Sequence, residues 1–461
     1  IDTKYFKDLE LEILSQFEDL DNSLDGWLIK SENYQALNTI LPKFKEKVQT
    51  IYIDPPFNLD SSDQFLYRTN YKDANWATLL ENRFKLAKDW LNKKGSIFVR
   101  CDYNGNWIVR YLMDEILINF KNEIAISRGT VPKGETGKME TGYDTLFFYS
   151  KEAENFFTPP LVKREEIKWQ QMHLPKERTT YELQIRYFNG KPLLPPRGRH
   201  WALSQERIDE YLKDGRIRIN KEKEYIDLKG NKVVGVPEIL QSEYIRANAN
   251  WTEIPGYSSS WEFQTENAEI LLRRVIESVS KKNNLVMDFF LGSGTTTAVA
   301  HKLGRKWVGV EMGEHFYSVI IPRMKKVLAY DKSGISKEVK EYQGGGFFKY
   351  YELEQYEEAL ANCKYEDGDL FNVPSRSPYR EYVFMKDEKM LKALEIDYEN
   401  NKVKVDLDKL YQNIDIAETL SNIIGKLIRQ ISDGQVEFDD GTKIDTKDLD
   451  YKLIKPLIWW E

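Results

Sequence analysis

Short apolar runs alternate with amphipathic segments along the first 150 residues. The apolar runs are rich in Val, Ile, Phe and Tyr, and they predict buried strands at 48–53, 96–100, 122–128 and 144–151. Apolar residues recur at helical spacing over 106–117 and over 75–95, where Gly95 is the expected C-terminal stop. Residues 5–45 are expected to be largely helical, with the short apolar piece GWLIK after the periodic residues.

The pattern is lost between about 151 and 250 and then resumes. Inside that stretch prolines cluster and arginines alternate with aromatic residues. After it, the sequence predicts a helix, a strand, a helix and a strand at 266–284, 285–290, 294–304 and 306–312. The simplest account is one α/β domain with a largely parallel sheet, interrupted by an inserted module of about 100 residues.

Four segments follow from this pattern. We expect residues 1–150 and 251–340 to build the sheet domain, residues 151–250 to form the insert, and residues 341–461 to form a C-terminal α+β auxiliary domain. The net charge of the chain is −7. Residues 161–240 nevertheless carry about five more basic than acidic side chains, and residues 351–461 about ten more acidic than basic ones.

Composition narrows the class of protein. The chain is 41% hydrophobic and 31% charged, and no apolar run approaches the roughly 20 residues that cross a bilayer, so we expect no membrane partner. The only cysteines, Cys101 and Cys363, have no metal-ligand spacing. They indicate a reducing cytoplasm and no structural metal.

The first chemical motif is VMDFFLGSGTTTAVAHKLGRKWVGVEM, residues 286–312. A strand ends at Asp288, Gly292 and Gly294 allow a tight turn, a helix begins near Thr295, and a second strand ends at Glu311. This order is typical of a nucleoside-binding βαβ unit, in which the distal acid accepts from both ribose hydroxyls. The alternative is an ordinary glycine-rich turn of a doubly wound sheet.

The ligand of this unit is better matched by S-adenosyl-L-methionine than by a dinucleotide. Thr297 occupies the position where a dinucleotide fingerprint has its third glycine, so close packing against a pyrophosphate is not supported. Asp288, beside the loop, suits the cationic amine of a methionine moiety better than an anionic phosphate.

The second motif is Asp54-Pro55-Pro56-Phe57, directly after the strand at 48–53. The Asp54 carboxylate and the Pro55 carbonyl are two acceptors at fixed separation, because both prolines stiffen the backbone. Two acceptors beside the stacking face of Phe57 fit a planar base with an exocyclic amine, stacking being worth ~1–3 kcal/mol. Accepting from both amine hydrogens frees the nitrogen lone pair to attack a sulfonium methyl. The alternative is a strand-terminating turn with a helix-capping acid.

Together the two motifs resemble those of the amino-group DNA methyltransferases. The catalytic motif precedes the cofactor motif FFLGSGT, an order similar to the β class of adenine methyltransferases, with a Rossmann-like sheet of circularly permuted motif order. SENYQALNTIL, PGYSSSWEFQTENAE and the tail GGGFFKYYELEQYEEAL look like the Mod subunits of type III restriction–modification systems. The resemblance implies that Phe289, Phe290, Ser293 and Thr295 also contact the cofactor, and that the start of the helix after FQTENAE lies near its methionine moiety.

Three departures from the family pattern affect expected cofactor contacts. The family usually has Thr-x-Lys-Pro where this chain has Thr265, Glu266, Asn267 and Ala268, so the role of Asn267 is open. A usual Gly-Asp before the catalytic strand is Ser31-Glu32 here, and Glu32 is the candidate substitute at the adenine of the cofactor. The usual Asp-Pro-Phe is Asp288-Phe289-Phe290.

The insert is the candidate target-recognition domain. PPRGRHW places Arg197, Arg199, His200 and Trp201 at a turn, and arginine can pair with guanine or grip phosphate. The alternative is a set of surface arginines beside a core tryptophan. No phosphate-binding Gly-x-x-x-x-Gly-Lys motif is present, so cleavage in a Mod-like system would need a separate helicase or nuclease subunit.

These observations predict a site-specific methyltransferase acting on the N6 amine of adenine in double-stranded DNA after base flipping. Cytosine N4 ranks second, since the family uses serine in place of Asp54 for that base; free adenine derivatives or RNA rank third. A specificity subunit for a separate nuclease stays open, and a dinucleotide oxidoreductase ranks last. Expected partners are DNA, a restriction subunit and a second copy of the chain, in a bacterial cytoplasm at the nucleoid.

Overall fold

The chain folds into two compact units, which are described separately. The computed structural model describes residues 1–58, 71–128, 139, 141–177, 184–261, 263, 265–355, 394–397, 402–405, 414–449 and 453. The larger unit comprises Ile1–Thr158 and Asn248–Glu461, and the smaller unit is Pro159–Ala247. No helix in the described ranges is long and apolar enough to span a bilayer.

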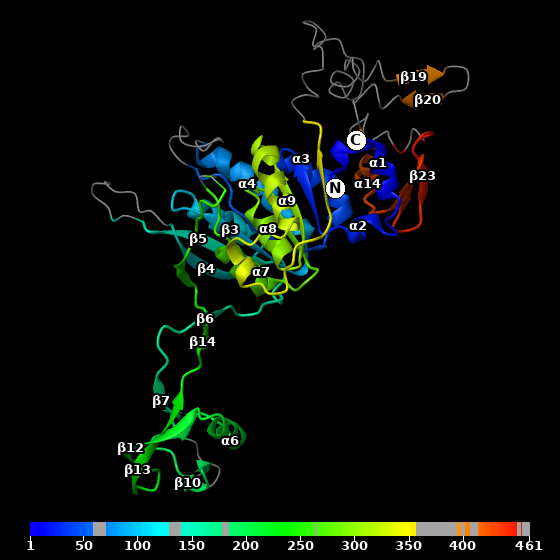
Figure 1. The fold of residues 1–461 in the computed structure, drawn as a ribbon. Helices are drawn as coiled ribbons and strands as arrows, with labels where there is room; N and C mark the ends of the chain where they lie inside the picture. Colours follow the sequence, from blue (N-terminus) through cyan, green and yellow to red (C-terminus); the bar gives the residue numbers. More distant parts are fainter. Residues whose placement is uncertain are drawn as a thin grey trace. The chain divides into compact units, whose positions relative to one another are not determined.

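A nine-stranded sheet forms the centre of the larger unit (Figure 1), in the order β15-β4-β5-β3-β2-β16-β17-β1-β18. Its strands are β1 (Gly26–Lys30), β2 (Val48–Ile53), β3 (Leu91–Cys101), β4 (Asn119–Ser127), β5 (Tyr143–Ser150), β15 (Asn250–Pro255), β16 (Leu285–Asp288), β17 (Lys306–Glu311) and β18 (Phe348–Glu352). Only the two pairings of β5 are antiparallel. The sheet is therefore largely parallel, as the sequence predicts.

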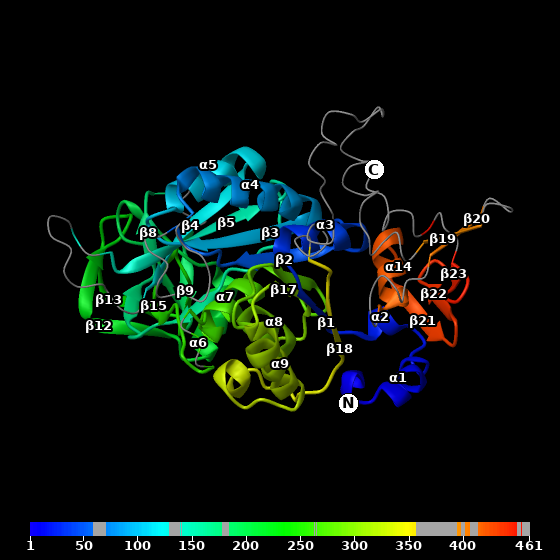
Figure 2. The same cartoon turned by 90° about the horizontal axis from the view of Figure 1, so that it is seen from above.

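Helices cover both faces of this sheet (Figure 2). One face carries α3 (Asn33–Phe44), α4 (Asp73–Trp90) and α5 (Asn106–Ile116), and the other carries α7 (Glu269–Val279), α8 (Thr295–Lys302) and α9 (Ile321–Leu328). Along β2, Ile51 and Ile53 pack into the core beneath α3, α4 and α5, while Tyr52 packs into the core beneath α7, α8 and α9. Because both faces are covered, the whole of β2 is buried, including the polar residues Gln49 and Thr50.

The topology places a switch point between β2 and β16. From β2 the chain crosses through α4 to β3, on one side; from β16 it crosses through α8 to β17, on the other side and over the opposite face. In doubly wound sheets, ligands bind beyond the carboxyl ends of the strands at such a switch point. Asp54 follows β2 and Asp288 ends β16, so both motifs meet at this edge.

Two predicted boundaries were wrong. GWLIK is not an appendix to a helical region but strand β1, paired in parallel with both β17 and β18. The helix predicted to stop at Gly95 ends at Trp90, because Leu91–Cys101 already belongs to β3. The predicted strand at 48–53 matches β2 at both ends, and those at 122–128 and 144–151 match β4 and β5 within three residues. The strand predicted at 96–100 lies within β3, which begins five residues earlier.

A separate small core joins the two ends of the larger unit. Leu20, of α2 (Leu20–Ser23), packs with apolar residues of α14 (Ile416–Ile424), β21 (Ile428–Ser432) and β22 (Gln435–Phe438). Around it lie α1 (Lys7–Leu14) and β23 (Lys443–Asp445). Lys43 of α3 is fully buried and pairs with Glu418 of α14 at 2.7 Å. A buried ion pair thus links α14 to α3, which lies against the central sheet.

The smaller unit consists of short antiparallel pairs around its own core. Its elements are β6 (Leu161–Lys163), β7 (Trp169–Gln171), β8 (His173–Pro175), β9 (Arg186–Phe188), β10 (Lys191–Leu193), β11 (Arg199–Trp201), α6 (Gln205–Lys213), β12 (Ile217–Ile226), β13 (Lys232–Leu240) and β14 (Tyr244–Arg246). Phe188, Trp201 and Ile208 are among its buried residues. The longest strands, β12 and β13, pair with each other, and β13 also pairs with β7.

Candidate active site

The loop between β16 and α8 has a backbone that favours glycine. The φ angle is +56° at Gly292 and +81° at Gly294, the residue immediately before α8. A Cβ on Gly294 would lie 3.4 Å from Cγ2 of Ile320. The absence of side chains at these two positions lets a ligand approach backbone N–H groups at the start of a helix.

Glu311 holds this loop from the end of β17. Its Oε2 accepts from the N–H of Gly292, and its Oε1 accepts from the N–H groups of Met312 and Gly313, each at 2.9 Å. Burial alone would raise the pKa of the carboxyl, but contact with His315 and these N–H groups lowers it overall. Glu311 is therefore an oriented carboxylate beside the glycine loop, which is the acceptor that a ribose diol requires.

Asp288 lies on the opposite side of the loop and is 2% exposed. Its Oδ1 accepts from the N–H of Phe290 at 3.0 Å, and its Oδ2 accepts from Oγ1 of Thr296 at 2.6 Å. Burial raises the pKa of Asp288 to about 7 against the opposing effect of these two hydrogen bonds. A cationic group bound here would favour the ionised form of Asp288.

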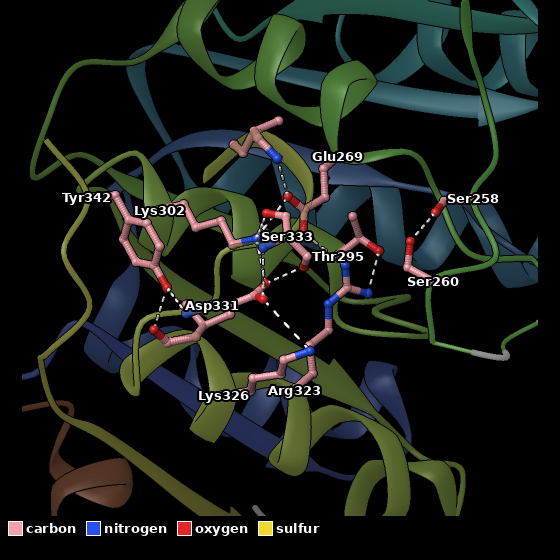
Figure 3. Close-up of polar contacts among 12 residues, drawn as sticks. Ser258, Ser260, Glu269, Thr295, Lys302, Arg323, Lys326, Asp331, Ser333 and Tyr342 are labelled. Atoms are coloured by element: carbon pink, nitrogen blue, oxygen red, sulfur yellow. Dashed lines mark hydrogen bonds and ion pairs between the residues drawn. The ribbon is translucent and has the colours of Figure 1, made fainter. Parts of the chain in front are cut away.

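Ser293 and Thr295, two further predicted cofactor residues, are buried within the loop. Their hydroxyls are 3.0 Å apart, and Nη1 of Arg323 donates to Oγ1 of Thr295 at 2.9 Å. Figure 3 shows Arg323 between Thr295 and Glu269, to whose carboxylate Nη2 of Arg323 is 3.3 Å away. Arg323 therefore fixes the loop to the start of α7, and both hydroxyls support the loop from within.

Glu32 and the two phenylalanines after Asp288 support the same loop. Glu32 caps α3, accepting from the N–H of Gln35 at 3.0 Å, and also pairs with Arg83. The next residue, Asn33, donates from Nδ2 to the Phe289 carbonyl at 2.8 Å. The rings of Phe289, 1% exposed, and Phe290 lie 5.5 Å apart. The α3 N-terminus is thus tied directly to the cofactor motif.

Asn267 contacts the catalytic motif. Its Nδ2 donates to Oδ2 of Asp54 at 3.0 Å, and its Oδ1 accepts from the Tyr52 hydroxyl at 2.8 Å. Thr265, two residues earlier, is half-buried in the same loop. Oδ1 of Asp54 has no hydrogen bond within the described part of the chain, so one oxygen is held and the other is available to a substrate.

Arg100 is the cation of this site, and its side chain is fully buried. Its Nη1 donates to the Gly256 carbonyl at 2.9 Å and to Oδ1 of Asn267 at 2.7 Å, while Nη2 donates to Oδ2 of Asp144 at 2.7 Å. Nε lies 4.0 Å from Oδ2 of Asp54. The guanidinium also stacks 3.8 Å from the ring centroid of Tyr257.

Burial raises the pKa of Asp54 to about 6, although the Arg100 charge and the Asn267 hydrogen bond both lower it. Nearby acids, Asp144 and Asp102, act with burial. Asp54 is accordingly a carboxyl whose charge state changes just below neutral pH. Its ionised form can only accept hydrogen bonds.

The prolines and Phe57 directly follow β2. Pro55 is buried, and Pro56 and Phe57 are half-buried. The Pro56 carbonyl accepts from the indole Nε1 of Trp76 at 2.8 Å. Trp76, at the start of α4, therefore fixes the turn that carries the Pro55 carbonyl and the Phe57 ring.

The four predicted DNA-contacting residues belong to the smaller unit. Arg197 and Arg199 are exposed and His200 is half-buried. Nη1 of Arg199 lies 3.1 Å from Nδ1 of His173. Trp201 is 5% exposed, and its ring centroid is 5.3 Å from that of Phe188. Trp201 is thus a core residue, and Arg197, in the turn before β11, and Arg199, in β11, are the exposed cations.

Sequence reasoning missed Arg100, Asp144, Tyr257, Trp76 and Arg323. The signal for two of them was present: Arg100 ends an apolar strand run, and Asp144 begins another. A charged residue at the edge of a fully buried strand needs a partner, and these two are each other's partner on the antiparallel neighbours β3 and β5. Among the described residues, no group of three or more His, Cys, Asp or Glu side chains is arranged to hold a metal.

Comparison with protein families assigns most of the chain to one family. A family model described as DNA methylase matches residues 48–322, a range that includes both motifs and the smaller unit. The type II methyltransferase M2.LlaDCHI of Lactococcus lactis subsp. cremoris is 34% identical over 308 residues, covering 66% of this chain and 90% of its own length.

Mod subunits are also similar. The Haemophilus influenzae protein described as "Probable type III restriction-modification enzyme HindVI Mod subunit" is 28% identical, covering 72% of this chain and 54% of its own length. The EcoPI Mod subunit of Escherichia phage P1 is 23% identical, covering 63% of this chain and 57% of its own length. The chain therefore spans about half the length of these Mod relatives.

Solved structures with similar folds are more distant. The M1.HpyAVI–SAM complex aligns with a TM-score of 0.37 at 14% identity, covering 65% of this chain and 98% of that one. PvuII DNA methyltransferase, described as cytosine-N4-specific, aligns with a TM-score of 0.38 at 13% identity, covering 71% of this chain and 94% of that one.

Proposed function

The chain belongs to the DNA methylase family, and on that premise we propose that it transfers a methyl group from S-adenosyl-L-methionine to the N6 amine of adenine in double-stranded DNA. The observation that carries the proposal is the Asp54 site. One oxygen of Asp54 is held by Asn267, and Oδ1 is left without a hydrogen bond in the described residues, beside a proline turn fixed by Trp76.

The residues at the glycine loop fit the cofactor. Gly292 and Gly294 leave the backbone open to close approach, Glu311 offers an oriented carboxylate to a ribose diol, and Asp288 offers an acid to the methionine amine. When bound, S-adenosyl-L-methionine supplies an electrophilic methyl group on a sulfonium. Residues with a Cβ rarely adopt the positive φ found at both glycines. The loop geometry therefore favours a closely bound ligand.

Asp54 and the Pro55 carbonyl orient the amine for the reaction. They accept hydrogen bonds from its two N–H groups, so the nitrogen lone pair turns away from the ring and toward the methyl. The new N–C bond forms as the C–S bond breaks, sulfur keeps the bonding pair, and one amine proton leaves. Phe57 stacks on the base, which must first leave the duplex at a cost of a few kcal/mol.

Cytosine N4 is the second candidate, because its exocyclic amine has the same two hydrogens. The matching family includes methylases of both N6 and N4 amines. One of the solved structures named above is described as cytosine-N4-specific. Asp54 favours adenine, since in the resembling families serine at this position accompanies cytosine.

The exposed arginines of the smaller unit support a DNA-recognition role for residues 159–247. Arg197 lies in the turn before β11 and Arg199 at the start of β11, in a segment with a net excess of basic residues. In the cell, by analogy with the Mod relatives, we propose that the chain acts within a restriction–modification system. A second copy of the chain and a separate restriction subunit are the partners proposed on the same ground.

Labelled S-adenosyl-L-methionine and DNA free of adenine methylation test the reaction. Digestion to nucleosides after incubation should give labelled N6-methyladenine. Label on cytosine would overturn the base assignment. Cofactor binding without any label would instead favour a specificity subunit for a nuclease, which a pulldown with a helicase-like restriction subunit would then examine.

A further inference from the structure

Burial and the neighbouring acids Asp144 and Asp102 oppose the ionisation of Asp54. Facing Asp54 are ionisable side chains from every neighbouring element, namely Tyr52 of β2, Arg100 and Cys101 of β3, Asp102 after β3, Asp144 of β5, Tyr257 after β15 and Asp288 of β16. Arg100 is the one cation in this described set. A protonated Asp54 would have a proton where the substrate amine needs an acceptor, so the charge of Asp54 must be maintained.

Two contacts maintain it. Asn267 uses its Nδ2 on Asp54, and its Oδ1 accepts at the same time from Nη1 of Arg100 and from the Tyr52 hydroxyl. Because both acceptor lone pairs of Oδ1 are engaged, the amide cannot flip without losing three hydrogen bonds. Arg100 is held in turn by Gly256 and Asp144, and its Nε, which is buried with no hydrogen bond in the described residues, points within 4.0 Å of Asp54.

We propose that Arg100 and Asn267 form a relay of positioning residues, in which Arg100 keeps Asp54 ionised and Asn267 orients Asp54 so that Oδ1 faces the substrate amine. The proposal rests on the proposed methyl transfer and extends it to two side chains that lie against Asp54. It also gives Asn267 a function. A lysine at position 267 would itself supply a cation, whereas here Arg100 of β3 supplies the cation and Asn267 forms hydrogen bonds with both Arg100 and Asp54.

The relay makes an expectation that a purely structural role does not. Asn267→Asp preserves the shape of the side chain but places a second carboxyl beside Asp54, and Arg100→Gln removes the cation. Both changes should raise the pKa of Asp54, because an added acid or a lost cation disfavours the charged form. Arg100→Lys retains a cation and should leave the ionisation of Asp54 near its wild-type position.

The ionisation is measured directly by the infrared band of the protonated carboxylic acid. Each protein is titrated and compared with its own Asp54→Asn partner, so that only the Asp54 signal remains. The band should disappear near pH 6 in the wild type and one pH unit or more higher in Asn267→Asp and Arg100→Gln. Asn122→Asp, the same exchange at an exposed position of β4, is the matched control and should not move it.

The pH profile of methyl transfer is the second readout. The acid limb of kcat should move upward with the infrared midpoint in Asn267→Asp, and activity should recover at higher pH. An unchanged midpoint in both Asn267→Asp and Arg100→Gln would overturn the relay, as would a rate loss equal at every pH. The infrared titration needs no turnover, so absence of methyl transfer by the wild type would refute the proposed function alone and leave the relay to be decided.

Discussion

Asn267 donates a hydrogen bond to Asp54 over 3.0 Å, although the two residues are 213 positions apart in the chain. This contact joins the loop before α7 to the catalytic motif after β2. It lies at the switch point of the sheet, where the cofactor loop begins after β16. Two motifs separated by an entire inserted unit thus become one site through the order of the strands.

The rate of methyl transfer should depend on pH through Asp54. Because its pKa is raised to about 6, the ionised acceptor form predominates only above that value. We expect kcat to rise with pH, by up to tenfold per unit below pH 6, and to level off above about pH 7. Single-turnover rates measured from pH 5 to 8 test this, and a rate that falls with rising pH over this range would contradict it.

Binding of S-adenosyl-L-methionine should strengthen as pH rises toward about 7. The pKa of Asp288 is raised to about 7, and a cationic amine prefers the ionised carboxylate. Thr296→Val removes the hydroxyl that donates to Oδ2 of Asp288 and should weaken binding about tenfold at pH 6.5, since a hydrogen bond to a charged group contributes about 1.5 kcal/mol. Calorimetric titration measures both effects. Equal affinities for the two proteins at every pH would exclude Asp288 as the amine site.

Lys43→Met should destabilise the larger unit. Lys43 is fully buried against Glu418, with Asp21 at 3.9 Å. Because Lys349 stays within 2.6 Å of both acids, we expect removal of the Lys43 cation to cost about 3 kcal/mol, the low end for one partner of a buried pair. Urea unfolding measures the loss. The control is Lys85→Met, at an exposed i,i+4 pair with Glu81, which should cost less than about 0.5 kcal/mol. Comparable costs for the two changes would show that the pair contributes no more than a surface contact.

The same cluster predicts acid sensitivity. Burial would raise the pKa of Glu418, but Lys349 and Lys43 lower it to about 2. A carboxyl whose folded pKa is depressed stabilises the fold above its unfolded value of 4.5, and that contribution is lost as pH falls from there toward 2. The acid unfolding curve of Lys43→Met should therefore be flatter than that of the wild type over this range. Parallel curves would argue against the assignment.

Arg197→Ala and Arg199→Ala should weaken DNA binding without altering cofactor affinity. Each exposed arginine that contacts a phosphate contributes about one unit to the slope of log affinity against log salt. Fluorescence anisotropy on duplex DNA at several salt concentrations measures that slope. Lys340→Ala, an exposed cation of the larger unit, is the control. Unchanged slopes in both arginine variants would show that this turn is not part of the DNA interface.

Much of the sheet could be predicted because its strands are buried on both faces. β2, β16 and β17 each contain a run of apolar residues, and a site residue lies at the end of each run: Asp54 follows β2, Asp288 ends β16 and Glu311 ends β17. The same property misled the prediction at GWLIK, since a short buried strand has no alternation to distinguish it from a helical fragment. The end of α4 was misplaced because Gly95 lies inside β3, four residues beyond the strand's true start.

The supporting network of the site could not be predicted in the same way. Arg100 reaches Asn267 across 167 positions, and neither residue belongs to a periodic pattern that pairs them. Only the parallel pairing of β2 with β3 and β16 brings the ends of these strands together. Sequence patterns find the motif residues, whereas their partners depend on tertiary register.

The comparison of wild type with Asp54→Asn under single-turnover conditions tests the central claim most directly. Both proteins are saturated with labelled S-adenosyl-L-methionine and duplex DNA, and cofactor affinity is measured in parallel. The account predicts N6-methyladenine from the wild type and a rate about 10²–10³-fold lower from Asp54→Asn, the scale of losing one preorganised hydrogen-bond contact, with similar cofactor affinity. An Asp54→Asn protein that methylates adenine at the wild-type rate would contradict it.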